Sequence, residues 1–141
     1  MEEMEASGNK VIIDTDILVD MLRGAEEAVR FVAEFERRGF MLSTTIINVF
    51  ELYYGAYKSK RRSQNLAATR KLLERIAILK MGLKSAERAG RAHAELESGG
   101  RPIGMRDAMI GAIAATRGYT LVTRNVDHLR KIKGLNLIAA P

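Results

Sequence analysis

The chain has 141 residues, which suits one domain, and 47% of them are hydrophobic, enough to build a core. The absence of cysteine excludes disulfides and thiolate metal sites and fits a cytoplasmic protein, and no apolar run approaches the roughly 20 residues of a membrane span. The formal net charge of +6 suits a polyanionic partner, either nucleic acid or an acidic protein segment.

The first ten residues are acidic and polar, and they contain no apolar segment of the kind found in signal peptides. We expect residues 1–10 to form a flexible tail, because chain ends without apolar anchors are rarely held in place. The single domain is expected to span residues 11–141.

Short apolar runs alternate along the chain with segments whose apolar residues recur at helical spacing. In chain order we expect a strand at 11–13, helices at 16–23 and 25–38, a strand at 40–43, a helix capped by Thr44 or Thr45 and ending near 58, a helix at 63–75, a strand at 76–79, helices at 85–96 and 105–117, and strands at 119–123 and 137–139. This alternation predicts an α/β fold with a central parallel sheet of four to five strands flanked by helices.

The first expected strand is a run of three β-branched residues, which is typical of a strand buried on both faces. It ends abruptly in Asp14, Thr15 and Asp16. Ligands of open α/β sheets bind just outside the carboxyl ends of the strands, so Asp14 is expected at the mouth of the sheet. A helix N-cap is the alternative for Asp14 and the favoured interpretation of Asp16.

Glu51 lies in the middle of the third expected helix, where apolar residues surround almost the whole circumference. We therefore expect this helix to be buried rather than to lie on the surface. A buried carboxylate without a partner is strongly unfavourable, so Glu51 needs a metal cation, a buried arginine or lysine, or a proton. A structural salt bridge in the core is the alternative to a metal site.

Asp107 raises the same question in the first turn of the 105–117 helix, because its neighbours one turn further on are apolar. The helix dipole favours an acid there by about 0.3–1 kcal/mol, but it does not explain an acid aimed at the core. Asn125 and Asp127 follow the 119–123 strand and again place polar oxygens at the carboxyl end of a strand, although Asn125 alone would be ordinary in a turn.

A parallel sheet can bring Asp14, Glu51, Asp107 and Asn125 to one crevice. Two carboxylates about 4 Å apart repel by roughly 4 kcal/mol at an effective dielectric constant of 20, so such a pocket requires divalent cations or raised pKa values. A set of oxygen ligands favours Mg²⁺ or Mn²⁺ over zinc. One or two such ions suit the attack of water on a phosphodiester.

These segments resemble the PIN domain and, within it, the VapC-type ribonuclease toxins of bacteria and archaea. The resemblance covers nearly the whole chain and is carried by residues 11–16, 51–56, 107–110 and 121–125. It implies a parallel sheet flanked by helices and a metal-dependent acidic pocket that takes Mg²⁺ or Mn²⁺. It also implies endonucleolytic cleavage of RNA that leaves a 5′-phosphate, and a homodimer that a cognate antitoxin protein silences.

Residue by residue, the resemblance implies that Asp14, Glu51 and Asp107 are the catalytic metal ligands. Thr123 matches a hydroxyl residue that orients Asp14. We interpret Asp16 as a helix cap or as an outer acceptor next to the ligands.

Asn125 falls at the fourth catalytic position of the family, which is often aspartate. Its amide oxygen can bind a cation, directly or through water, but brings no charge. Whether there are one or two metal ions therefore stays open, and Asp127 is the alternative for the fourth position.

Two basic segments are candidates for contact with RNA phosphates, with a solvated helix end as the alternative for the first. They contain Lys58, Lys60, Arg61 and Arg62, and Arg124, Arg130, Lys131 and Lys133.

Four aromatic residues recur in the third helix, Phe50, Tyr53, Tyr54 and Tyr57. A place in the core is the favoured interpretation, and a dimer or antitoxin surface is the alternative. The two histidines, His93 and His128, lack ligand spacing, and we expect neither to be catalytic.

Two other functions remain open. Residues 14–18 resemble the nucleophile motif of haloacid dehalogenase-type phosphohydrolases, in which Asp14 would form an aspartyl-phosphate, but this leaves Glu51 unexplained. The second is a PIN-like RNA-binding domain in which Asn125 marks lost catalysis.

Overall fold

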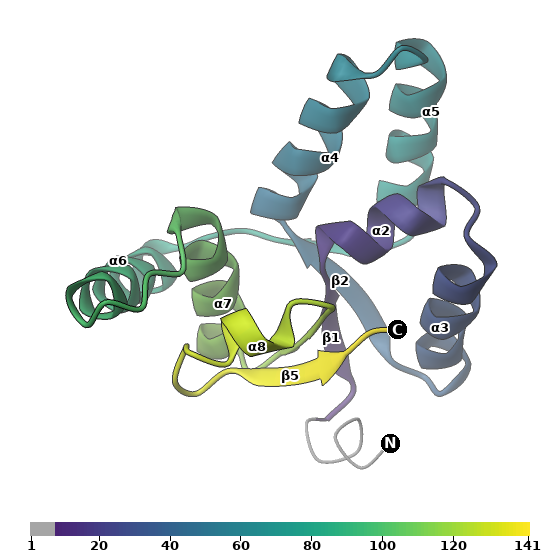
Figure 1. The fold of residues 1–141 in the computed structure, drawn as a ribbon. Coiled ribbons are helices and arrows are strands. Elements are labelled where there is room, and N and C mark those ends of the chain that lie inside the picture. Colours follow the sequence, from purple (N-terminus) through teal and green to yellow (C-terminus); the bar gives the residue numbers. More distant parts are fainter. Residues whose placement is uncertain (1–7) are drawn as a thin grey trace.

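The computed structural model describes residues 8–141, which form a twisted sheet with helices on both faces (Figure 1). Residues 1–7 of the expected tail lie outside the described residues, and Lys10 already belongs to the first strand. The elements in chain order are β1 (Lys10–Ile13), α2 (Thr15–Leu22), α3 (Glu26–Arg37), β2 (Met41–Thr45), α4 (Ile46–Lys58), α5 (Arg62–Leu73), β3 (Ala77–Leu79), α6 (Leu83–Ser98), α7 (Met105–Arg117), β4 (Thr120–Thr123), α8 (Val126–Leu129) and β5 (Asn136–Ala139).

The sheet has the strand order β3-β2-β1-β4-β5, and all of its strand pairs are parallel. The central strand β1 pairs on one side with β2, where Val11 faces Leu42, and on the other with β4, where Val11 faces Thr120. The chain therefore builds β2 and β3 on one side of β1 and then crosses over to build β4 and β5 on the other side. In open α/β sheets such a reversal creates a crevice at the carboxyl end of the central strand.

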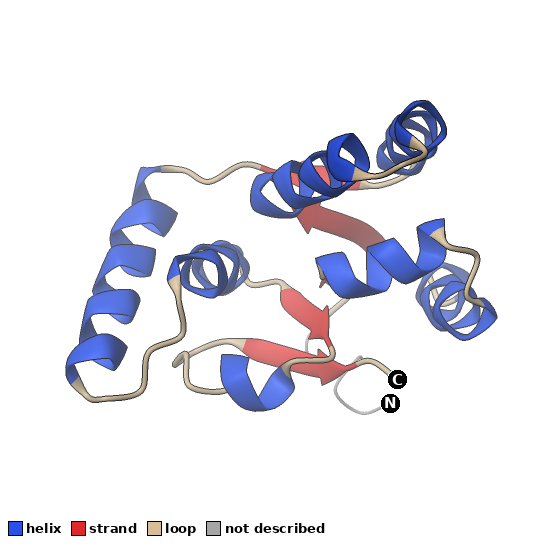
Figure 2. Ribbon diagram, turned by 45° about the horizontal axis from the view of Figure 1, so that its top comes forward, coloured by secondary structure: helices blue, strands red, loops and turns tan. Residues whose placement is uncertain are grey.

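Successive residues of β1 enter different cores, which explains its uninterrupted apolar run. Val11 and Ile13 pack into the core that includes Phe35, whereas Ile12 packs into the core that includes Ile110. Side chains of a strand alternate between the two faces of a sheet, so a strand covered on both faces must be apolar throughout. Figure 2 shows helices above and below the strands, which confirms the predicted α/β arrangement.

The helices α4 and α5 form a hairpin that projects beyond the sheet (Figure 1), and the prediction that α4 is buried all round is wrong. Its buried residues, Asn48, Leu52 and Ala56, recur every four residues and form a single stripe. Phe50 and Tyr54 lie on the other side and are 67% and 56% exposed. Only one side of a projecting helix meets neighbouring elements, so the remaining apolar residues face solvent.

The favoured core position of the aromatic cluster is consequently wrong for most of its members. Phe50, Tyr54 and Tyr57 are exposed, and only Tyr53 is partly buried. The rings of Phe50 and Tyr54 stack on each other with their centroids 6.2 Å apart.

The α7 helix has the predicted ends, and the other predicted elements are each present with ends that differ by one or two residues. The exception is α8, a four-residue helix where a turn after the 119–123 strand was expected. Among the described residues, no helix combines the length and the apolarity that crossing a bilayer demands.

Candidate active site

Asp14 is the first residue after β1 and lies in the crevice at the carboxyl end of the sheet. Its main-chain N–H donates to the carbonyl of Val122 in β4 (3.0 Å), which continues the pairing of the two strands by one residue. Its side chain caps α2 by accepting from the N–H of Thr15 (2.8 Å). Asp14 is therefore a helix N-cap, which the sequence allowed as the alternative to a place in a ligand site. Capping uses only one of the hydrogen bonds that its carboxylate accepts.

The remaining contacts of the Asp14 carboxylate come from three distant elements. Its Oδ1 accepts from Asn48 Nδ2 (3.0 Å) and from Arg106 Nη2 (2.7 Å), and its Oδ2 accepts from the hydroxyl of Thr123 (2.8 Å). The side chain is only 4% exposed. A buried carboxylate that accepts several hydrogen bonds from fixed donors is held in one orientation.

Glu51 lies in the same crevice and comes from α4, one helical turn after Asn48. Its Oε1 accepts from the hydroxyl of Thr15 (2.6 Å) and from Arg106 Nη2 (3.0 Å), and its Oε2 accepts from Arg106 Nε (2.7 Å). The expected alternative, a salt bridge, is therefore present. It lies at the opening rather than in the core, because the side chains of Glu51 and Arg106 are 28% and 37% exposed.

Arg106 joins the acidic residues into one cluster, since its guanidinium also donates from Nη1 to Asp107 Oδ1. Burial disfavours its charge, but the hydrogen bonds to Glu51, Asp14 and Asp107 and the charge of Asp14 outweigh burial and raise the pKa of Arg106 above its usual value. The arginine is therefore a permanent cation among Asp14, Glu51 and Asp107. Sequence reasoning passed over it, because an exposed-looking arginine in a first helical turn carries no special signal.

The turn before α7 places Arg106 and Asp107 together at the site. Gly104 is the N-cap of this helix and has a φ of 85°, in the left-handed region that favours glycine. The second oxygen of Asp107 lies 3.2 Å from Nε2 of His128, a nitrogen that is also 2.9 Å from the carbonyl oxygen of Ile103. His128, for which no catalytic part was expected, thus contacts one of the acids.

Asn48 and Thr15 are site residues that the sequence prediction missed. Asn48 is fully buried; its Nδ2 donates to Asp14 Oδ1 and to the hydroxyl of Thr15 (2.8 Å), and its Oδ1 accepts from the N–H (3.1 Å) and hydroxyl (2.6 Å) of Thr45. Thr45 and Asn48 form a capping box at the start of α4. The available signal was a threonine followed three residues later by a polar side chain in an otherwise apolar segment.

The structure places the four remaining predicted site residues at different distances from the cluster. Thr123 contacts Asp14 directly, and its hydroxyl also accepts from the main-chain N–H of Asn125 (3.1 Å), whose side chain is exposed. Asp127 is 97% exposed and pairs with Arg130 (3.0 Å), outside the cluster.

Asp16 is not the cap of α2, which is Asp14, but lies in the first turn of the helix and accepts from the N–H of Ile17 (2.8 Å). Burial and the charge of Asp14 raise the pKa of Asp16. Hydrogen bonds from the main chain of Ile17 and Arg124, and the charge of Arg124, lower this pKa but do not outweigh the rise. Asp16 therefore lies close enough to Asp14 to feel its charge.

The donor set has the chemistry of a site for a hard divalent cation, because carboxylate oxygens from three elements face one positive centre. That centre is the Arg106 guanidinium. With the carboxylates arranged around the arginine, residues 8–141 contain no group of three or more acidic or histidine side chains in position to hold a metal ion.

Comparisons with known proteins bear on the fold of the chain. The sequence model of the PIN domain matches residues 11–135. The protein named tRNA(fMet)-specific endonuclease VapC of Shigella flexneri is 32% identical over 126 residues, which cover 89% of this chain and 94% of that protein.

Two solved structures are similar in fold. They are VapBC2 from Rickettsia felis bound to a DNA fragment from its promoter (27% identity, TM-score 0.85, 94% of this chain and 99% of that one) and DNA-bound VapBC from Salmonella typhimurium (29% identity, TM-score 0.84, 94% and 98%).

The two buried threonines of β4 test whether the Thr123 hydroxyl supports Asp14. We expect Thr123→Val to lower the free energy of unfolding by about 1–3 kcal/mol, because it leaves a buried carboxylate oxygen without its donor. Thr120→Val is the matched control, since the hydroxyl of Thr120 is buried and has no hydrogen-bond partner; it should be neutral or stabilising. Urea denaturation of both variants measures the difference, and equal effects would contradict the assignment.

Proposed function

The chain belongs to the PIN domain family, and from this premise we propose that it is a metal-dependent endoribonuclease, the toxin of a toxin–antitoxin pair. The observation that carries the proposal is the convergence of Asp14, Glu51 and Asp107 on one positive centre at the mouth of the sheet. The relative from Shigella flexneri, which is named an endonuclease, supports it. We place its action on RNA in the cytoplasm.

Asp14, Glu51 and Asp107 would hold Mg²⁺ or Mn²⁺, with Asn125 or Asp127 as candidates for a further ligand. The bound ion would supply a water activated for attack on an RNA phosphodiester. The protein's own part is to hold the ligands in place. Polar residues around the ligands support this role. Buried Asn48 and Thr123 bind Asp14, and the partly buried Thr15 and His128 contact Glu51 and Asp107.

The two alternative functions are less well supported. A phosphohydrolase would use Asp14 as its nucleophile, which gives no reason for Glu51 and Asp107 to converge on the same centre. A domain that only binds RNA would have no use for three converging carboxylates, which repel the phosphates of its ligand. The similar proteins named endonuclease and ribonuclease also favour cleavage.

Asp14→Asn tests the proposed activity. We expect cleavage of RNA in Mg²⁺ or Mn²⁺ to fall by more than about 100-fold, because even residues that only support metal ligands are worth about 10–100-fold. Initiator tRNA is the first substrate to assay, since the Shigella flexneri relative is named for it, followed by total RNA.

Glu97→Gln, an exposed change at the end of α6, is the matched control and should cleave as the wild type does. Circular dichroism of Asp14→Asn should remain that of a folded protein. Full cleavage by Asp14→Asn, in a preparation free of other nucleases, would refute the proposal.

Arg106 gives the proposed metal site an internal competitor. Its guanidinium donates to Asp14, Glu51 and Asp107, and a divalent cation and the arginine cannot neutralise the same oxygens at once. Metal binding therefore requires the arginine to leave the centre. Its side chain is partly exposed and long, so it can turn outward without unfolding α7.

We expect Arg106→Ala to tighten Mn²⁺ binding by about tenfold or more, a gain of about 1.4 kcal/mol, because no guanidinium has to be displaced. In the presence of a chelator the same variant should melt at a lower temperature, since the carboxylates lose their counter-charge. Titration calorimetry and thermal melts measure the two effects without any substrate.

Arg37→Ala, which removes a surface pair with Glu34, is the control and should change neither quantity appreciably. Unchanged Mn²⁺ affinity in Arg106→Ala would show that the arginine does not compete.

The proposed toxin acts with two protein partners, a cognate antitoxin and a second copy of the chain. We place the contact with the second copy on the exposed side of α4, where Phe50 and Tyr54 stack and Lys58 Nζ lies 5.0 Å from the centre of the Tyr54 ring. Exposed stacked aromatics are common at the centre of interfaces, and a two-fold dimer needs only one patch that complements itself.

Sedimentation of the free chain tests this surface. The wild type is expected to sediment as a dimer, and Phe50→Lys as a monomer, because a charge would be buried without a partner. Met41→Lys, at another exposed apolar position, is the control and should remain dimeric. A dimer that survives Phe50→Lys, or a monomeric wild type, excludes this interface.

A further inference from the structure

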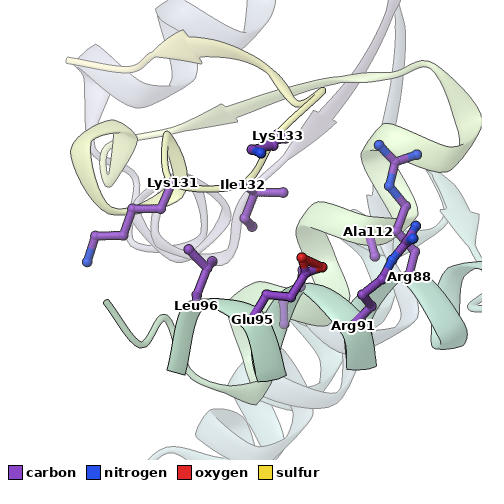
Figure 3. Close-up of a pocket in the computed structure, with 10 residues that line it drawn as sticks. Arg88, Arg91, Glu95, Leu96, Ala112, Lys131, Ile132 and Lys133 are labelled. Carbon is purple, nitrogen blue, oxygen red and sulfur yellow. The ribbon is translucent and has the colours of Figure 1, made fainter. Parts of the chain in front are cut away.

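A second cluster of charge lies outside the acidic site, around a hollow between α6, α7 and the segment that follows α8 (Figure 3). The hollow has a volume of about 310 Å³. Arg88 and Arg91 of α6 and Lys131 and Lys133 of the segment after α8 line it. Only one acid, Glu95, is among the lining residues.

The structure divides the basic segment that the sequence analysis singled out between 124 and 133. Arg124 pairs with Asp20 (2.6 Å), and Arg130 pairs with Asp127. Lys131 and Lys133 instead join arginines from α6 that sequence reasoning did not notice, because these are about forty residues away in the chain.

These four cations lack partners in the described part of the chain. No hydrogen bond or ion pair within residues 8–141 involves the side chain of Arg88, Arg91, Lys131 or Lys133. In Figure 3 the side chains of Arg88, Arg91 and Glu95 extend from α6 on the right of the hollow, and Lys131 lies on its left with its side chain extending away from the arginines. Unpaired like charges around one hollow repel each other, and an anion would relieve this repulsion.

The hollow is also shaped to take more than a bare ion. Its floor is apolar and includes Leu96, Ala108, Ala112 and Ile132. The Arg88 guanidinium packs against Gly134, where a Cβ would lie only 2.9 Å from Nη2. An apolar floor beneath a cationic rim fits a nucleotide, whose base is flat and apolar on its faces and whose phosphate is anionic.

The hollow and the acidic cluster share α7, and the segment that lines the hollow directly follows α8, which carries His128. Asp107 of the cluster and Ala108 of the hollow are consecutive residues of α7. His128, which contacts Asp107, lies three residues before Lys131. A strand of RNA drawn toward three carboxylates needs cations beside them to offset the repulsion of its phosphates.

We propose that this hollow is a binding site for a nucleotide of single-stranded RNA next to the acidic cluster, with Arg88 and Arg91 holding its phosphate. The identity of the ligand as RNA rests on the proposed ribonuclease function, whereas the presence of an anion site does not. Glu95 weakens the site, since its carboxylate lies among the cations that bind the phosphate.

Fluorescence anisotropy with a labelled single-stranded RNA oligonucleotide, in chelator so that nothing is cleaved, tests the site. We expect the double variant Arg88→Ala/Arg91→Ala to bind at least about tenfold more weakly. The slope of log affinity against log salt should shrink by about 0.7, since the two arginines hold one phosphate and each neutralised phosphate of a single strand contributes about 0.7. Glu95→Gln should bind several-fold more tightly, and this gain keeps the test decisive if the double variant folds poorly.

The double variant Arg70→Ala/Lys71→Ala, at exposed positions of α5, removes the same charge and is the matched control. An equal loss in both double variants, or unchanged affinity in Glu95→Gln and in Arg88→Ala/Arg91→Ala, would overturn the proposal. Binding of adenosine monophosphate as tight as that of the oligonucleotide would overturn the assignment to an RNA strand.

This test and the cleavage test fail separately. Wild-type RNA binding in chelator that depends on Arg88 and Arg91, together with full cleavage by Asp14→Asn, would keep the hollow and remove the ribonuclease mechanism. If Asp14→Asn loses cleavage and Arg88→Ala/Arg91→Ala leaves RNA affinity unchanged, the ribonuclease mechanism is kept and the RNA site in the hollow is excluded.

Discussion

The architecture of the site depends on the attraction between one guanidinium and three carboxylates that would otherwise repel each other. Asp14 precedes α2, Glu51 lies in the second turn of α4 and Asp107 in the first turn of α7, and nothing in the strand pairing alone requires their oxygens to converge. Arg106 offsets part of their negative charge at a position where the site still opens to solvent. The acidic residues can therefore be assembled before any external cation arrives, at the cost that the cation must compete with the arginine.

The remainder of the site uses polar groups that the fold needs in any case. Asp14 caps α2, Asn48 belongs to the capping box of α4, and Thr123 ends β4. Main-chain groups at helix starts require such partners. The parallel sheet collects these ends on one side, so the same side chains that satisfy the main chain also fix the carboxylates.

The sequence predicted those features that depend on local patterns. The apolar run before Asp14 and the spacing in α7 are repeated over several residues, and both elements are present where they were expected. The exposure of α4 could not be predicted in this way, because it depends on how far the α4–α5 hairpin extends beyond the sheet. The contacts of Arg106 with Asp14 and Glu51 join segments far apart in the chain, and so does the contact of Arg88 with Gly134. Neither arginine differs locally from an ordinary surface arginine.

Asn48 has a particular consequence for how this protein can change. Its amide group is shared between the start of α4 and the carboxylate of Asp14, with its oxygen on Thr45 and its nitrogen on the acid. Aspartate could still accept from Thr45 but would face Asp14 with a second negative charge, and serine is too short to reach both. A substitution at position 48 therefore weakens the start of α4 and the support of Asp14 together. Substitutions that lower the activity and keep the stability have to occur at other positions of the chain.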